Sequence, residues 1–465
     1  MVKHRFLLAL ALGGVLGGCS GAAMQPAVPS LQNGITPSGH NSSSVTVLPP
    51  MLRAALSASA SWPQSYYGPG HTGYNPKETT LSSGNVSGLT LLGGPSTGCA
   101  PEAVVLYQGT LFTRHSGCGS IAGTLAAFDA STFAQKWSVT VGNWMGGDVE
   151  SIAVGDGRVI TGCVLSHSVG LCGYSPVSGK LLWSYNPCPA SCGDDGFVQS
   201  GFSYANGVVY AVFTGGNNGS INGVYAVNAK TGTAIWSNVT GRGDNSIQSG
   251  SVAVGSYIYY ACGKFQHGLG LCALNAADGS FAWTSYPNIG FGSAALAYSN
   301  GSVYVNSGCS EGCTPQVAAF SGTSGSLLWA NATYGGSGNA WQSPAVAKGV
   351  AYFSVYPGSG PSLIALSGAT GKLRWSVSET DQSAPSVANG VVYTVTTLDP
   401  NHFQTVAHGA SDGKALWSAA ANRLGNVPPP VIANGTLYSP DSGPTCGVCA
   451  YGLASQSRSR GVHVR

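Results

Sequence analysis

The sequence predicts an all-β protein that folds as a single β-propeller, with eight four-stranded blades as the expected count and seven as the alternative. Three observations support this fold class. Tryptophan recurs at near-constant spacing, Asn-Gly pairs mark hairpin turns in several repeats, and the chain is rich in glycine (69 of 465 residues) and poor in charge (8%). Such a composition suits short strands joined by many tight turns.

Seven tryptophans define the repeat. Successive members lie 46, 53, 47, 46, 46 and 42 residues apart, which is about the length of one four-stranded blade. A large ring at one position per blade buries apolar surface between neighbouring sheets. We therefore interpret these rings as blade-docking residues and not as platforms for a cofactor. They are Trp137, Trp183, Trp236, Trp283, Trp329, Trp375 and Trp417.

The predicted hairpins number one more than the tryptophans. Pairs such as Asn206-Gly207 and Asn434-Gly435 fit turns in which both central residues have positive φ. The last repeat stops short of a fourth strand, while residues 89–92 form an early strand with no hairpin before it. We expect these two ends of the fold to share the last blade, because this closure removes an exposed sheet edge. The first strands begin near Pro101, Glu150, Gln199, Gln248, Gly292, Gln342, Gln382 and Val427.

Residues 1–18 are predicted to be a lipoprotein signal peptide. A basic start at Lys3 and Arg5 precedes an apolar run over residues 6–16, which ends in Leu-Gly-Gly and then Cys19. This order is typical of a lipobox, in which the thiol of the cysteine carries the lipid. An ordinary signal peptide with an incidental cysteine is the alternative.

The rest of the chain divides into three parts. Residues 19–60 are rich in Ser, Pro, Ala and Asn and predict a disordered tether, residues 61–455 hold the propeller, and residues 456–465 form a disordered basic tail. We expect an exported monomer, lipid-anchored to the bacterial cell membrane or outer membrane and facing the periplasm or the exterior. A net charge of +3 without a Lys/Arg block argues against a nucleic-acid partner.

The cysteines also indicate an oxidising compartment. Thirteen are present, and twelve remain once Cys19 is set aside for lipid. We expect six local disulfides that stiffen blade loops. A redox-active Cys446-x-x-Cys449 pair and a zinc site are the alternatives. The expected pairs are Cys99–Cys118, Cys163–Cys172, Cys188–Cys192, Cys262–Cys272, Cys309–Cys313 and Cys446–Cys449.

One polar pattern recurs where a ligand would meet the central channel. A glutamine or glutamate followed by serine stands at the start of several innermost strands, and these side chains are expected to form a polar ring at one channel mouth. The alternative is that they bond to the backbone of neighbouring blades. Glu150 adds a charge to the ring. The members are Glu150, Gln199, Gln248, Gln342 and Gln382.

Other titratable residues give no strong signal. His115, His167 and His267 lie near equivalent hairpin loops, and we expect solvated loop side chains there and not a metal site. The spacing of the acids nearest the channel or the loops does not mark a calcium site. These acids are Asp148, Glu150, Asp194, Asp195 and Asp244.

The repeat Ala-(Leu/Val)-(Asp/Asn)-Ala-x-(Thr/Asp)-Gly-x-x-x-Trp resembles that of the pyrroloquinoline-quinone (PQQ) repeat family across residues 62–455. The stretch from Trp62-Pro63 to Asn75-Pro76 also looks like the leader segment of some members. The resemblance implies either a quinoprotein dehydrogenase or a non-enzymatic outer-membrane assembly scaffold. The dehydrogenases typically place a disulfide of adjacent cysteines over the quinone, with a Glu/Asn/Asp set for calcium and a catalytic aspartate. No two cysteines are adjacent here.

The predicted function is therefore that of a non-enzymatic binding or scaffold module in the cell envelope, with an envelope protein or polysaccharide as partner. No catalytic residue, cofactor or metal is assigned. The alternative is a PQQ-dependent dehydrogenase that binds PQQ with calcium in an atypical site. Polysaccharide hydrolysis is a third hypothesis, and the sparse acids argue against the two carboxylates that it needs.

Overall fold

The computed structural model describes residues 61–454 apart from 119–120, 143–150, 166–167, 189–196, 216–220, 240–250, 265–267, 286–292, 310–315, 335, 338–341, 356–361, 382, 400–401, 423–426 and 442–445. Within strands, the side chains at 116, 118, 121–122, 168, 197–200, 263–264, 268–269, 293, 309, 336–337, 362, 380–381 and 398–399 also lie outside the description. All described residues belong to one compact unit, residues 49–465. Cys19, the expected signal peptide, tether and basic tail lie outside the described residues.

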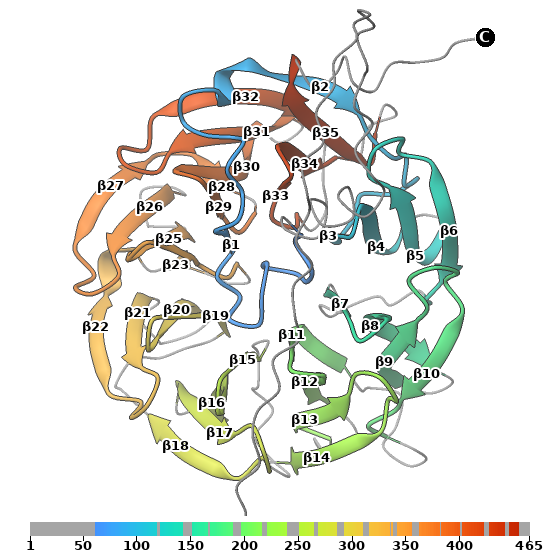
Figure 1. Ribbon diagram of the computed structural model, residues 1–465. Coiled ribbons are helices and arrows are strands. Elements are labelled where there is room, and N and C mark those ends of the chain that lie inside the picture. The colour runs from blue at the N-terminus through green and yellow to red at the C-terminus, as the bar shows by residue number, and fades with distance from the viewer. Residues whose placement is uncertain are drawn as a thin grey trace, which may run out of the picture. The chain divides into compact units, whose positions relative to one another are not determined.

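Eight sheets of antiparallel strands form the blades, and each blade adds its strands in order from the centre outward (Figure 1). Blade 1 holds β3 (Ala103–Tyr107), β4 (Thr110–Cys118), β5 (Ile121–Asp129) and β6 (Gln135–Thr140). Blade 2 holds β7 (Ile152–Gly155), β8 (Arg158–Leu165), β9 (Ser168–Tyr174) and β10 (Leu181–Tyr185). Blade 3 holds β11 (Phe197–Ala205), β12 (Val208–Thr214), β13 (Gly223–Asn228) and β14 (Ala234–Val239). Blade 4 holds β15 (Val252–Val254), β16 (Tyr257–Lys264), β17 (Gly268–Asn275) and β18 (Phe281–Ser285).

The second half repeats the plan. Blade 5 holds β19 (Ser293–Ser299), β20 (Ser302–Cys309), β21 (Gln316–Ser321) and β22 (Leu327–Asn331). Blade 6 holds β24 (Ala345–Ala347), β25 (Val350–Val355), β26 (Ser362–Ser367) and β27 (Leu373–Val377). Blade 7 holds β29 (Ser386–Ala388), β30 (Val391–Asp399), β31 (His402–Gly409) and β32 (Ala415–Ala421). Blade 8 holds β33 (Val431–Ala433), β34 (Thr436–Pro440), β35 (Val448–Leu453) and β2 (Leu89–Gly93).

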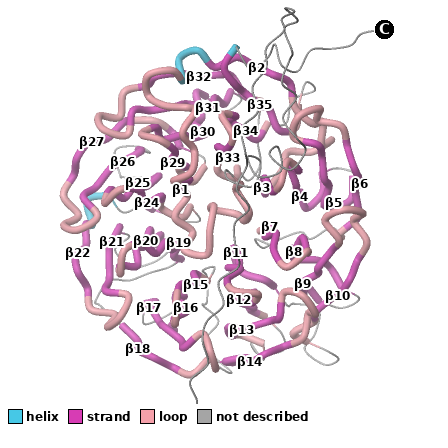
Figure 2. The backbone as a smooth tube through the Cα atoms, viewed as in Figure 1, coloured by secondary structure: helices cyan, strands magenta, loops and turns pink. Residues whose placement is uncertain are grey.

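Short elements complete the description. The strands β1 (Tyr74–Asn75), β23 (Gly336–Ser337) and β28 (Thr380–Asp381) pair with strands of blades 7, 5 and 7. The 3-10 turns η1 (Val86–Gly88) and η3 (Ala332–Tyr334) account for the helical segments in Figure 2. No helix among the described residues is long and apolar enough to cross a membrane.

The ring closes as the sequence predicts. The innermost strands contact one another in an unbroken cycle from β3 through β33 and back to β3. In blade 8 the early strand β2 pairs antiparallel with β35, with Leu89 opposite Leu453 and Thr90 opposite Gly452. This pairing supplies the missing fourth strand. It confirms eight blades over seven and leaves no open blade in the cycle.

The turns and the core follow from the same repeat. Asn206 and Gly207 at the first hairpin turn of blade 3 have φ of 50° and 80°, the mirror-image turn conformation that Asn-Gly favours. Apolar side chains of adjacent blades pack against each other, as where Tyr210 of blade 3 meets Ile258 and Leu274 of blade 4. The core is therefore a set of interfaces between sheets and not one central mass.

Candidate functional site: the inner ring and its leader

The leader segment, residues 62–76, crosses the centre of the ring in Figure 1 and bonds to the innermost strand of every blade. It starts at blade 1, where Trp62 and Leu106 exchange two backbone hydrogen bonds of 2.7 and 3.0 Å. It ends at blades 7 and 8, where β1 runs parallel to β29 and the Asn75 amide donates to the carbonyl of Ile432 over 2.8 Å.

The leader meets each blade at an equivalent position, two residues before the first hairpin turn. An innermost strand has one edge with no neighbouring strand, so its amides there need another acceptor. In six blades the amide N–H at this position donates to a carbonyl of the leader. These bonds are Leu106 to Trp62 (3.0 Å), Val154 to Pro63 (2.8 Å), Ala253 to Pro69 (3.1 Å), Tyr298 to Gly70 (2.7 Å), Val346 to Thr72 (2.8 Å) and Val387 to Gly73 (2.7 Å).

Side-chain amides serve the other two blades. In blade 3, Gln64 both accepts from the Tyr204 N–H and donates to the Tyr204 carbonyl, each over 3.0 Å. In blade 8, Asn75 plays the donor role described above. Glu78 extends the attachment, because one of its carboxylate oxygens accepts from the Gly435 N–H over 2.9 Å. The leader is therefore an integral part of the ring.

The middle of the leader has an uncommon backbone conformation. Tyr66, Tyr67 and His71 have φ of 59°, 79° and 49°, and Gly73 follows with 54°. Positive φ is unfavourable for residues with a bulky side chain. The bonds to the surrounding blades must offset this strain.

His71 lies at the buried centre of the segment. Its side chain is 3% exposed, its Nε2 lies 3.2 Å from the hydroxyl oxygen of Ser203, and its ring is 5.4 Å from that of Tyr66. Burial lowers the pKa of His71 to about 4, although a hydrogen bond between the ring and the Phe202 backbone opposes part of this effect. The imidazole is therefore neutral at pH 7.

The expected polar ring is mostly outside the description. Glu150, Gln248 and Gln382 lie in segments that are not described, and of Gln199 only the backbone is described, as part of β11. Gln342 is half-buried, and its backbone carbonyl accepts a hydrogen bond of 3.1 Å from Asn306 of the neighbouring blade. The ring therefore remains a prediction.

Polar side chains in this region bridge neighbouring blades. Asn306 of blade 5 also donates to the Ser354 carbonyl of blade 6, and the Ser354 hydroxyl donates to the Ser383 carbonyl of blade 7 over 2.9 Å. The Ser251 hydroxyl of blade 4 donates to the Tyr210 carbonyl of blade 3. Such bonds satisfy buried polar groups and fix one blade against the next.

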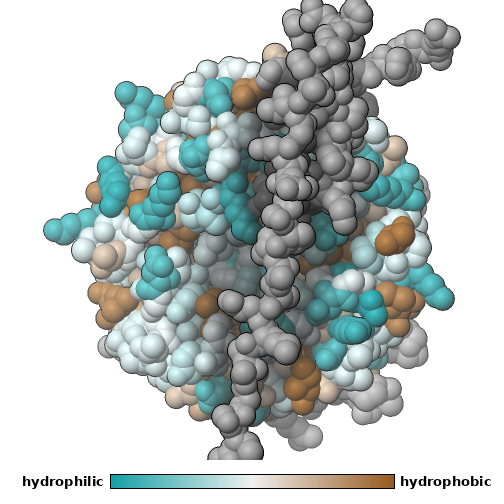
Figure 3. Space-filling model, in the orientation of Figure 1, coloured by the Kyte–Doolittle hydropathy of each residue, from teal (hydrophilic) through white to brown (hydrophobic). Residues whose placement is uncertain are grey.

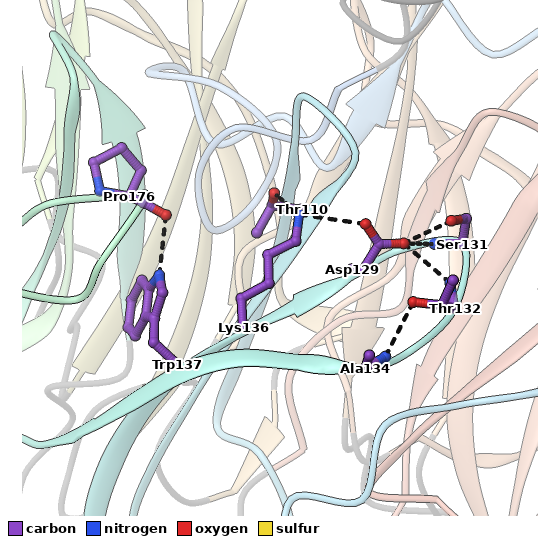
Figure 4. Close-up of polar contacts among 8 residues, drawn as sticks. All are labelled: Thr110, Asp129, Ser131, Thr132, Ala134, Lys136, Trp137 and Pro176. Carbon is purple, nitrogen blue, oxygen red and sulfur yellow. Dashed lines mark hydrogen bonds and ion pairs between the residues drawn. The ribbon is translucent and has the colours of Figure 1, made fainter.

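The structure places all seven repeat tryptophans at blade interfaces. Each indole N–H donates to a backbone carbonyl of the next blade, as Trp137 does to Pro176 over 3.0 Å in Figure 4. Most rings also lie on the positive-φ glycine of the neighbouring turn. The other acceptors are Ala229 for Trp183, Ala276 for Trp236, Gly322 for Trp283, Gly368 for Trp329, Ala410 for Trp375 and Leu89 for Trp417.

Three disulfides are described in full. Cys163–Cys172 joins β8 to β9 in blade 2, and Cys262–Cys272 joins the same two strands of blade 4, each with a Cα separation of 5.8 Å. Cys446–Cys449 lies beside β35. Cys99 and Cys188 are also disulfide-bonded, but the side chains of Cys118 and Cys192 lie outside the description, as do those of Cys309 and Cys313.

The cluster of Asp441, Cys446 and Cys449 does not fit a metal in this state. Its ligand atoms lie within 4.8 Å of one another, but both sulfurs are joined in the disulfide. Zinc needs thiolates as ligands. Asp441 instead accepts two hydrogen bonds from Asn422.

One histidine expectation is wrong. His115 is not a solvated loop residue, because β4 extends past it and leaves its side chain 4% exposed. Burial and then the neighbouring Arg114 guanidinium lower the pKa of His115. His167 and His267 lie outside the described residues, as do Asp148, Asp194, Asp195 and Asp244.

The sequence did not reveal His408. It occupies a buried position on β31 that other blades fill with apolar residues, and its Nε2 lies 3.2 Å from Glu379 after blade 6. Its Nδ1 lies 3.0 Å from the Gly413 carbonyl. The sequence did contain an indication of this site, because the other repeats have an apolar residue at the position of His408.

Carboxylates with described side chains are all engaged within the fold. Glu102 forms an ion pair of 2.9 Å with the buried Arg114, and Asp156 accepts from the Tyr204 hydroxyl over 3.0 Å. Glu379 lies 3.2 Å from His408 of the next blade, and the other carboxylates accept hydrogen bonds or form ion pairs nearby: Glu78, Asp129, Asp278, Asp412 and Asp441. Within the described residues no set of oxygen ligands is left over that fits PQQ with calcium.

Exposed apolar side chains gather on the outermost strands. In every blade that carries a repeat tryptophan, the register shifts just before that ring, so two successive residues face solvent. In blades 2 to 6 these positions form an apolar belt, defined here by Leu181, Leu182, Ile235, Phe281, Leu327, Leu328 and Leu373. Blade 1 instead carries Gln135 and Lys136 there. Figure 3 shows apolar residues spaced along the circumference.

Comparison with known families identifies the class. One family model of the PQQ-repeat type matches the sequence, and it is described as outer membrane protein assembly factor BamB. It matches four overlapping stretches: residues 84–259, 122–308, 220–354 and 315–450. The chain therefore belongs to this family of PQQ-like repeat propellers. No curated protein matches the chain in sequence.

Solved structures share the fold. A europium-containing methanol dehydrogenase is similar with a TM-score of 0.64 at 13% identity, over 84% of this chain and 91% of that one. The quinohemoprotein alcohol dehydrogenase from Comamonas testosteroni gives 0.63 at 14%, over 87% and 82%. BamB from Moraxella catarrhalis gives 0.50 at 13%, over 76% and 94%. At these identities the likeness concerns the fold alone.

Proposed function

We propose that this chain is a non-enzymatic binding module of the bacterial cell envelope and that its partner is a protein. The family model that covers most of the propeller describes an outer-membrane protein assembly factor. The described inner ring supports the proposal, because its polar and acidic side chains hold the blades and the leader together. Surfaces on the outside of the ring are then the ones available to a partner.

The apolar belt is the observation that carries this proposal. Phe281 is 56% exposed, and Leu181 and Leu328 are each 50% exposed. The fold does not require apolar residues at these positions, because blade 1 has Gln135 and Lys136 in the same place. Exposed apolar side chains repeated at the same position of five successive blades offer a protein partner a series of apolar contacts. An apolar protein surface suits the belt better than a polysaccharide, which would need more hydrogen-bonding groups.

Site-specific cross-linking tests the proposal. A photoreactive residue at Leu328 in the full chain should give one discrete adduct in intact envelopes, and the same residue at Lys136 should not. Replacing Leu181, Phe281 and Leu328 with serine should reduce capture of the cross-linked partner protein at least tenfold. The melting temperature of this variant should equal that of the wild type. The matched control replaces Gln135 and Lys136 with serine. Equal capture by both variants would contradict a belt-mediated function.

A cofactor titration addresses the enzymatic alternative. If the chain is non-enzymatic, the full chain should show no saturable heat when it is titrated with PQQ and calcium. Saturable binding together with a raised melting temperature would contradict the non-enzymatic proposal and return attention to Glu150 and the polar ring.

We also propose that Cys19 carries the lipid that holds the protein at the membrane. Cys19→Ala should move the protein from the membrane fraction to the soluble fraction. Cys99→Ala is not a suitable control, because Cys99 is disulfide-bonded. Ser20→Ala keeps the cysteine and should remain in the membrane fraction. A Cys19→Ala protein that stays membrane-bound would contradict the anchor.

A further inference from the structure

We propose that the leader is an acid-released strap: protonation of His71 detaches the middle of the leader, residues 66–73, from Ser203 of blade 3 and from blades 4 to 7 while both ends stay attached. Release would expose the inner edges of these blades at the centre of the ring. The proposal is independent of the envelope partner and of the lipid anchor.

The attachments of the middle segment are individually small. Blades 4, 5 and 6 each hold it by one backbone hydrogen bond, from Ala253, Tyr298 and Val346. The ends are held more firmly, because Trp62 is fully buried and shares two bonds with Leu106, and Asn75 is fully buried against Ile432. When its hydrogen bonds to the blades weaken, the middle segment of the leader therefore opens as a loop while both ends stay bound.

His71 is the group in the leader that responds to acid. Residues 62–76 contain no Asp, Glu, Lys or Arg, and the tyrosines titrate far above neutral pH. His71 contacts the Tyr66 ring of the leader, and the Ser203 hydroxyl and Phe202 backbone of β11. None of these groups carries a negative charge, and among the described residues no carboxylate contacts His71. An imidazolium at this buried position therefore has no counter-ion among the described residues, and burying it is costly.

The backbone of the segment favours release. Tyr66, Tyr67 and His71 hold positive φ in the attached state. A released loop relaxes to ordinary conformations and lets the protonated ring reach water. Strain and charge therefore act in the same direction.

The direction of the pH effect follows from the two pKa values. The pKa of His71 is about 4 when buried, against an ordinary 6.5. The attached state binds fewer protons than the released state between these values, so the stabilisation of the attached state by neutral His71 is fully present above pH 6.5 and is lost progressively as pH falls toward 4. By this shift the release equilibrium rises on the order of tenfold between pH 7 and 5, and on the order of a hundredfold by pH 4.

Hydrogen–deuterium exchange of the full chain tests the strap. After correction for intrinsic rates, the protection of peptides that contain Ala253, Tyr298 and Val346 should fall by those factors on acidification. Peptides from the outer hairpins and from Leu106 should stay protected. His71→Asn is neutral and tolerates positive φ, so its inner peptides should lose this pH dependence. His115→Gln, at another buried histidine, should keep it.

Three results would overturn the proposal. Inner-strand protection in the wild type that is unchanged down to pH 4 shows that the strap does not open. Equal loss of protection in inner and outer peptides shows global acid unfolding instead. A folded His71→Asn protein with wild-type pH dependence assigns the effect to another group. If His71→Asn does not fold, the proposal is still tested by comparing the protection of inner and outer peptides in the wild type and in His115→Gln.

Discussion

The side-chain amide of Gln64 pairs with the backbone of Tyr204 as a strand peptide would, accepting from its N–H and donating to its carbonyl over 3.0 Å each. The residues are 140 positions apart, and Gln64 is 3% exposed. At this blade the Tyr204 amide does not donate to a leader carbonyl, although the Ser203 hydroxyl donates to the Pro69 carbonyl over 3.1 Å. The side-chain amide of Gln64 thus replaces, at blade 3, the hydrogen bond that the leader backbone makes to the inner strands of six other blades.

Gln64→Ala should lower the free energy of unfolding by about 2 kcal/mol, because two buried backbone groups of Tyr204 lose their partner. Chemical denaturation of the full chain measures this change. Gln135→Ala, whose amide bonds only to an exposed serine, is the control and should change stability by less than about 0.5 kcal/mol. Equal effects of the two substitutions would show that the Tyr204 pairing contributes little.

A pair of glycines separates backbone strain from ring packing. Gly232 and Gly390 have similar φ, 73° and 80°. A Cβ at Gly232 would meet the Trp183 ring at 2.6 Å, whereas nothing lies within 4 Å of one at Gly390. Gly390→Ala should therefore cost about 1 kcal/mol from strain alone, and Gly232→Ala about 3 kcal/mol.

Tryptophan fluorescence provides an independent check of this pair. Gly232→Ala must displace the Trp183 ring and should shift the emission maximum, while Gly390→Ala should leave it unchanged. Similar stability losses with no spectral change in either variant would mean that the ring is not held by the glycine.

The fold was predictable because each blade is encoded locally. A turn, a strand pair and a tryptophan lie within one repeat, and the contacts that matter most, such as Trp183 to Ala229, join adjacent repeats. The closing pair β2 and β35 was also predictable from the sequence. The last repeat lacks a fourth strand, and the early strand has no hairpin before it.

The leader was not predictable in this way. Asn75 bonds to a residue 357 positions later, and no periodic pattern links them. The segment could be recognised as a family feature, but its bonds to all eight blades depend on the closed ring. The burial of His115 was also not predictable, because the sequence marks the ends of strands poorly. Strand β4 continues past the position where a loop was expected.

Removing the cross-strand disulfide of blade 2 should destabilise the protein by about 2 kcal/mol. Cys163→Ala combined with Cys172→Ala opens a loop with a sequence separation of 9, for which the chain-entropy gain is small. Thermal unfolding under oxidising conditions measures the loss. Cys262→Ala with Cys272→Ala, at the same strands of blade 4, should behave alike.

Reduction gives the internal control for this prediction. With a thiol reductant present, the wild type and the double variants should have the same stability, because all of them then lack these cross-links. A wild type whose melting temperature does not respond to complete reduction would show that these cross-links do not contribute to stability.

The Asp129 turn should make blade 1 sensitive to acid. Its carboxylate accepts from Ser131 and Thr132 and lies 3.4 Å from the Lys136 ammonium (Figure 4). These hydrogen bonds, and then Lys136, hold the pKa of Asp129 well below its usual range despite partial burial. The stabilisation is therefore present above the ordinary pKa of about 4 and is lost as pH falls below it. Because the carboxylate is largely exposed, solvent screening limits it to less than about 1 kcal/mol.

Asp129→Asn tests this charge at constant shape, since Asn228 accepts the same two turn amides in blade 3. The variant should be less stable than the wild type at pH 7 by up to about 1 kcal/mol, and the difference should shrink as pH falls below about 4. Urea denaturation at pH 7 and at several pH values below 4 measures it. Asp278→Asn is the comparison, because the described contacts of its carboxylate are hydrogen bonds to Ser280 and not an ion pair. A difference for Asp129→Asn that persists at low pH would assign the effect to turn geometry and not to charge.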